Sequence, residues 1–168
     1  MKQLLITGFA LLLASNVYGQ DQVTFSKVFT PNTIGPGSVS TITFTVTNGR
    51  TSPVTGLDFT DVLPTVPGNV DIATPANAAT SCPLGVVDAP DGGGTISFSD
   101  GQLGAGQSCT VTVDVTAGTP GIHTNPAVTL DFNEAFEVGA SSQPVDLTVD
   151  ATLPGFSKSF APNTIPLG

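Results

Sequence analysis

Apolar residues alternate with polar residues, nearly all of them threonines, over two long stretches of this chain, and this alternation limits the folds that the chain can adopt. In residues 40–47, Ile42, Phe44 and Val46 fall on one face and threonines fall on the other. Residues 109–117 repeat the pattern, with Cys109 at the start of the apolar row. Because successive side chains of a β-strand point to opposite faces, both stretches are predicted to be half-buried strands.

Shorter alternating stretches and turn signals extend this pattern. Apolar residues two positions apart indicate four more strands, within residues 57–59, 95–98, 128–132 and 145–149. Between the strands lie pairs typical of tight turns: Pro36-Gly37, Asn48-Gly49, Asp91-Gly92 and Pro120-Gly121. No stretch shows a convincing helical stripe. About seven to nine short strands joined in this way predict an all-β fold, an antiparallel β-sandwich.

The N-terminus has the features of a secretory signal peptide. Lys2 is followed by an apolar run from Leu4 to Ala14, and Val17-Tyr18-Gly19 suits signal peptidase cleavage. A retained transmembrane anchor is the alternative, but it needs about 20 apolar residues and this run is shorter. We therefore expect residues 1–19 to be removed and the protein to be secreted or displayed at the cell surface.

A thirteen-residue segment occurs twice. Residues 25–37 return at 156–168 with nine identical positions. This match predicts a module over residues 20–153 and the start of a second, truncated repeat at 154–168. Tandem modules of this size commonly build stalks or arrays.

The expected export of the protein affects the oxidation state of its two cysteines, Cys82 and Cys109. An oxidising compartment favours a disulfide between them, and free buried thiols are the alternative. Cys82 lies in residues 64–94, which are rich in Pro, Ala, Asn and Gly and show little alternation outside 70–72. We expect this segment to be a long excursion at one end of the sandwich, tethered by the disulfide.

The chain is acidic, with 13 Asp and Glu against 4 Lys and Arg. This balance argues against nucleic acid and anionic membrane surfaces as partners, because both repel negative charge. We expect no membrane insertion after signal removal.

The order of several short motifs resembles the conserved-repeat domains of bacterial surface proteins, filed as domain of unknown function eleven and its relatives. The resemblance spans nearly all of residues 23–150 and rests on these segments: Pro36-Gly37, Thr47-Asn48, Asp61-Val-Leu-Pro64, Ser108-Cys-Thr-Val-Thr-Val113 and Thr124-Asn125-Pro-Ala127. It implies an immunoglobulin-like sandwich in a long exported multi-repeat protein, and it brings no catalytic residues.

Candidate chemistry is sparse. His123 is the sole histidine, and we expect it to be a polar residue at a strand edge rather than a catalytic base. No cofactor is expected. Calcium is the one metal considered, with Asp88, Asp91 and Asp100 as candidate ligands, and solvated loop charges are the alternative that we favour.

Lys27 is an anomaly, because alternation places it on the same face as Phe25 and Phe29, and the second repeat copies this with Lys158. We expect an edge strand in which Lys27 snorkels to water or pairs with a surface acid. The alternative is an autocatalytic amide bond from Lys27 to an Asn or Asp, with Asn125 and either Glu134 or Asp61 as candidate participants.

Together these features predict a non-enzymatic spacer or stalk repeat of an exported bacterial surface or matrix protein. Its expected partners are neighbouring repeats, and other surface proteins or host and matrix ligands are further candidates. A ligand- or calcium-binding adhesin module is the alternative function.

Overall fold

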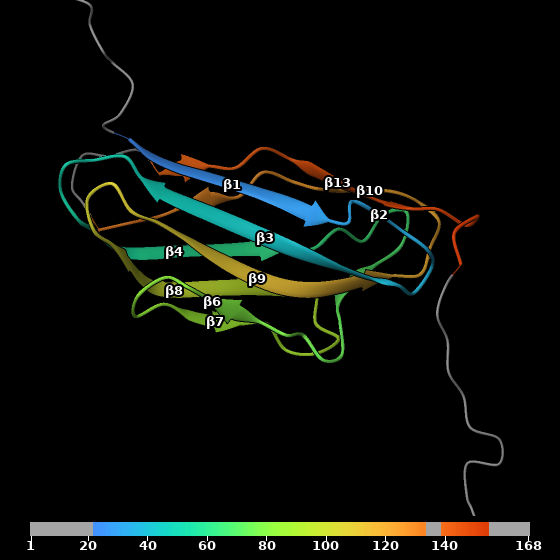
Figure 1. Cartoon of the computed structure of the whole chain (residues 1–168). Coiled ribbons are helices and arrows are strands. Elements are labelled where there is room, and N and C mark those ends of the chain that lie inside the picture. Colours follow the sequence, from blue (N-terminus) through green and yellow to red (C-terminus); the bar gives the residue numbers. More distant parts are fainter. Residues whose placement is uncertain (1–21, 134–138, 155–168) are drawn as a thin grey trace, which may run out of the picture.

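The computed structural model describes residues 22–133 and 139–154, and within these ranges it contains thirteen β-strands and no helix (Figure 1). The strands are β1 (Val23–Thr30), β2 (Thr33–Ile34), β3 (Val39–Asn48), β4 (Val54–Val62), β5 (Val70–Ile72), β6 (Ala79–Thr80), β7 (Val86–Asp88), β8 (Thr95–Leu103), β9 (Ser108–Ala117), β10 (Gly121–Asn125), β11 (Thr129–Leu130), β12 (Ala140–Ser141) and β13 (Val145–Val149). Seven of these strands have five residues or more.

The strands form a β-sandwich, which confirms the predicted fold class. One layer is the antiparallel sheet β1-β3-β9-β5, in which β6 also pairs with β9. The other layer consists of three smaller sheets, β4-β8-β7, β11-β12 and β10-β13-β2. A single bridge between Asp58 and Asp131 connects the first two of these sheets. The turn glycines Gly37 and Gly92 have φ values of 74° and 73°, as the turn signals predict.

The core follows the alternation of the sequence. In β3 and β9 every second side chain is buried, and the positions between them are threonines except for Asp114. Four phenylalanines from both layers meet in the centre, with ring centroids 4.6–6.0 Å apart: Phe25, Phe44, Phe59 and Phe98. Phenylalanine suits this position because its burial leaves no polar atom without a partner.

Residues 64–94 do not form the excursion at one end that the sequence predicts. Their short strands extend one sheet in each layer, because β5 and β6 pair with β9 while β7 pairs with β8. Val70 and Ile72 are each 1% exposed and anchor the segment in the core. The weak alternation at 70–72 was therefore the sign of a real strand, and the segment has apolar anchors besides the cysteine tether.

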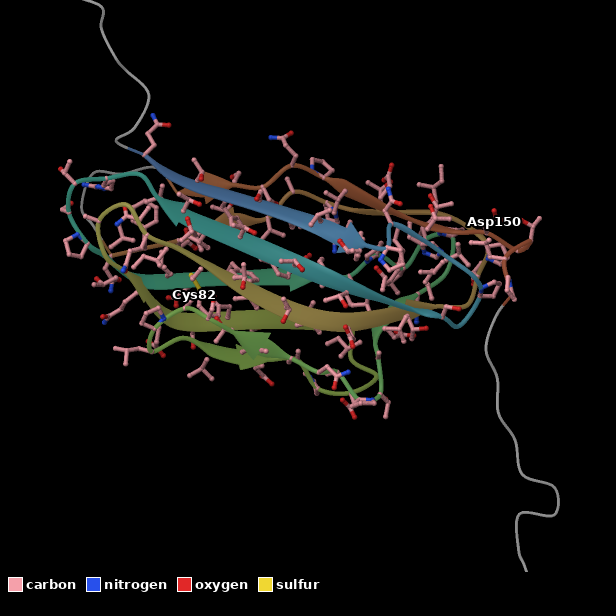
Figure 2. The ribbon with its side chains drawn as sticks, in the orientation of Figure 1. Cys82 and Asp150 are labelled. Atoms are coloured by element: carbon pink, nitrogen blue, oxygen red, sulfur yellow. A yellow bond between two sulfur atoms is a disulfide. The ribbon has the colours of Figure 1, made fainter. Side chains whose placement is uncertain are left out.

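A disulfide joins Cys82 to Cys109, the pairing that the sequence predicts (Figure 2). Cys82 lies two residues after the end of β6, and Cys109 is the first inward-facing residue of β9. Both residues are buried. The bond therefore ties the middle of the 64–94 segment to the central strand of the large sheet.

The described chain enters and leaves the sandwich at opposite ends. β1 begins at one end, and Asp150, directly after β13, lies at the other (Figures 1 and 2). Hydrogen bonds from the backbone N–H and hydroxyl of Thr152 lower the pKa of Asp150 and close a turn there. No helix long and apolar enough to cross a membrane occurs in residues 22–133 and 139–154.

Candidate functional site

Lys27 lies on the inner face of β1. The strand alternates regularly, so Phe25, Lys27 and Phe29 all point into the sandwich. The side chain of Lys27 is 0% exposed. β1 is an edge strand of its sheet, as expected, but the predicted snorkelling to water is wrong because the facing layer covers the side chain completely.

Two further polar residues point inward from that facing layer. Asp61 follows the buried Phe59 on β4, and Asn125 follows the buried His123 at the end of β10. Both Asp61 and Asn125 are 0% exposed. Alternation along three different strands therefore directs a lysine, an aspartate and an asparagine to one point between the layers.

The three side chains are in mutual contact. Lys27 Nζ donates hydrogen bonds to Asn125 Oδ1 and to the backbone carbonyl oxygen of Pro126. It also lies 3.4 Å from Asp61 Oδ2. The same carboxyl oxygen accepts a hydrogen bond from Asn125 Nδ2 at 3.1 Å. Asp61 Oδ2 thus faces both the lysine nitrogen and the amide nitrogen.

Burial shifts the pKa values of Lys27 and Asp61. Desolvation lowers the pKa of Lys27 and is opposed by the charge of Asp61 and its hydrogen bond. Desolvation also raises the pKa of Asp61, opposed mainly by Lys27 and by the hydrogen bond from Asn125. Asp61 Oδ1 is buried without a hydrogen-bond partner, which makes an ionised carboxylate costly. Both shifts favour an uncharged amine beside an uncharged carboxyl group.

His123 is buried rather than exposed. Its Nδ1 lies 3.1 Å from the carbonyl oxygen of Gly68, and its Nε2 lies 2.8 Å from that of Thr119. His123 is the middle residue of β10, which is an edge strand of its sheet, and its ring connects β10 to two loops.

The three calcium candidates are not brought together. Asp91 accepts a hydrogen bond from the backbone N–H of Ala76 at 2.9 Å, and Asp100 accepts one from Ser99. Asp88 lies at the end of β7. Among the described residues, no group of three or more His, Cys, Asp or Glu side chains could hold a metal ion.

Of the residues considered for an amide bond, Lys27, Asp61 and Asn125 are in non-covalent contact. Glu134, and Lys158 of the second repeat, lie outside the described residues. Sequence reasoning missed the carbonyl of Pro126 and the two carbonyl partners of His123. No signal could have found these groups, because backbone atoms carry no sequence identity.

Residues 23–149 match the family described as Domain of unknown function (DUF7933). The sequence motifs also predict a domain without an established function, in agreement with this match. The more specific resemblance to domain of unknown function eleven stays a prediction. No curated protein matches the chain.

Among solved structures, the full-length major pilin SpaD from Corynebacterium diphtheriae is similar, with a TM-score of 0.55 and 15% identity. The match covers 74% of this chain but 34% of the pilin, so the chain spans about a third of the pilin's length. At this identity the likeness shows the fold alone.

Two other solved structures are more distant. A family 123 glycoside hydrolase from Clostridium perfringens has a TM-score of 0.45 at 11% identity, covering 79% of this chain and 28% of the enzyme. BslA, described as a bacterial hydrophobin, has a TM-score of 0.44 at 13% identity, covering 80% of this chain and 99% of BslA. These scores are too low to support an inference about function.

Proposed function

The chain belongs to the family of DUF7933 domains, whose description names no activity, and from its fold we propose that it is a non-enzymatic spacer or stalk repeat of an exported bacterial surface or matrix protein. The main supporting observation is that the described chain enters at one end of the sandwich and leaves at the other (Figure 1). A module with this geometry adds its own length to a multi-repeat chain, whereas adjacent termini would make it a side branch.

Two further observations support export and a structural role. The disulfide between Cys82 and Cys109 suits an oxidising compartment outside the cytoplasm. The fold resembles that of a major pilin over 74% of this chain. The partners that we propose are neighbouring repeats of the same chain, with other surface proteins or matrix ligands as further candidates.

An exchange experiment in the parent bacterium tests this function. Residues 23–149 are replaced in frame by an unrelated β-sandwich of similar length whose termini also lie at opposite ends, and a second strain carries a simple deletion. A spacer role predicts that the replacement restores surface display and cell adhesion while the deletion does not. Failure of the replacement beside a displayed wild-type protein contradicts the spacer role and favours the alternative, a ligand- or calcium-binding adhesin module.

Surface labelling tests export separately. Antibodies against residues 22–153 are expected to label intact cells as strongly as permeabilised cells. Labelling that requires permeabilisation contradicts a surface location.

A further inference from the structure

We propose that Lys27 and Asn125 react within the folded protein to form an intramolecular isopeptide bond, and that Asp61 is the catalytic residue that transfers the proton. The reaction joins Lys27 Nζ to Asn125 Cγ and releases ammonia. This proposal rests on the contacts of the three buried side chains and is independent of the spacer role.

The first step of the argument is proximity. Lys27 Nζ already contacts Asn125 Oδ1, which is one bond away from the carbon to be attacked. The two residues are 98 positions apart in sequence, so folding alone brings them together. Holding two reacting groups in contact converts a bimolecular step into a unimolecular one and lowers its barrier.

The second step is the state of the nucleophile. An ammonium group has no lone pair, so the amine must be neutral to attack the carboxamide. Burial lowers the pKa of Lys27 and favours that neutral form. Desolvated lysines are activated nucleophiles for the same reason.

The third step is the path of the proton. When Nζ attacks Cγ, the amine must lose one proton, and the departing Nδ2 must gain one to leave as ammonia. Asp61 Oδ2 lies 3.4 Å from Nζ and 3.1 Å from Nδ2, so one carboxyl oxygen can accept the first proton and a carboxyl proton can pass to the second nitrogen. The Nζ–Cγ bond forms, the Cγ–Nδ2 bond breaks, and Asp61 returns to its starting state.

The surroundings protect the product. Asp61 and Asn125 are 0% exposed, and Lys27 is 6% exposed when its backbone is counted and 0% exposed in its side chain. The product therefore lies between the two layers, where water has little access to hydrolyse it.

Mass spectrometry of the reduced, secreted protein provides the test, after its N-terminus has been determined. The wild-type protein is expected to be lighter than its own sequence requires by the mass of one ammonia molecule. The variants Lys27→Met and Asn125→Ala are expected to have their full sequence masses.

Trypsin digestion of the denatured, reduced protein gives an independent readout. The chain has 4 Lys and Arg residues, so tryptic fragments are large and few. In the linked protein Lys27 is acylated and resists cleavage, and the fragment that ends at Arg50 stays attached to the fragment that contains Asn125. In an unlinked wild-type protein trypsin also cleaves after Lys27, and the fragment that ends at Arg50 separates from the fragment that contains Asn125 on a denaturing gel.

Asp61→Asn tests the proton transfer, and Asp71→Asn is the matched control, because Asp71 lies on β5 away from the site. We expect the first variant to keep its full mass and the second to lose ammonia like the wild type. If Asp61→Asn does not fold, Asn125→Asp still tests the chemistry, since it yields the same linked fragment with loss of water instead of ammonia.

The proposal would be overturned by a folded wild-type protein that has its full sequence mass, is cleaved after Lys27, and releases the fragment ending at Arg50 from the fragment that contains Asn125. A fully linked Asp61→Asn protein would overturn the role of Asp61.

Discussion

At the scale of single residues, His123 shows how one buried polar side chain connects separate parts of the fold. Its two ring nitrogens face the carbonyl oxygens of Gly68 and Thr119. We predict that His123→Leu lowers the free energy of unfolding by about 1–3 kcal/mol, because it removes the hydrogen bonding of a fully buried ring to two part-buried backbone carbonyls. Urea denaturation measures the loss. Ile122→Thr is the control, since Ile122 is 61% exposed on the same strand and its replacement should change stability little. Equal stability of His123→Leu and the wild type would show that water replaces the ring.

A second residue-scale prediction concerns Asp61 without its lysine. Burial raises the pKa of Asp61 above its ordinary value of 3.8, and Lys27 opposes that rise. In Lys27→Met, at pH values between the unfolded-state and folded-state pKa of Asp61, the Asp61 carboxyl group is protonated in the folded protein and ionised in the unfolded chain. The stability of this variant should be greatest at about pH 4 and should fall as the pH rises towards 7, through the raised folded-state pKa.

Urea denaturation of Lys27→Met at several pH values checks this prediction. The double variant Lys27→Met/Asp61→Asn is the matched control, and it should lack this fall in stability. Parallel pH profiles for the two proteins would contradict the raised pKa of Asp61.

At the scale of elements, the disulfide and the apolar anchors hold different parts of the 64–94 segment. Replacing Cys82 and Cys109 together by alanine is predicted to lower stability by about 3 kcal/mol, as expected for a closed loop of this length. The backbone N–H of Ser81, bonded to Thr110, should then exchange hydrogen much faster. The N–H of Ile72, bonded to Gly93, should keep its protection because Ile72 remains in the core. Hydrogen exchange measured residue by residue separates these outcomes, and equal loss of protection at both amides would contradict separate anchoring.

The elements also show what the sequence could reveal. β3 and β9 were predictable because they are long and half-buried, so their alternation reports directly on the two environments. β6, β11 and β12 have two residues each, too few for any period to be recognised. Alternation also predicted that Lys27 faces inward, but not what it meets. Its contact with Asp61 depends on how two sheets pack, and this packing leaves no local pattern in either strand.

At the scale of the whole molecule, calcium provides a direct test of the adhesin alternative. The structure does not gather Asp88, Asp91 and Asp100 into a group that could hold a metal ion. We therefore predict equal melting temperatures with calcium and with chelator. A ligand present at one hundred times its dissociation constant would add about 2.7 kcal/mol, a shift of several degrees. A rise with calcium that disappears in Asp91→Asn would contradict this expectation and support the adhesin alternative.

The meeting of β1 with the end of β10 has a mechanical consequence for a chain stretched between its two ends. With Lys27 bonded to Asn125, tension entering through β1 crosses directly to β10 and leaves through β13. The intervening chain, including the disulfide, carries none of it. The two bonded residues are 98 positions apart, which corresponds to roughly 300 Å of extended chain that could not be released under load. A stalk built from such modules would resist lengthening where an unlinked stalk of the same sequence would unravel.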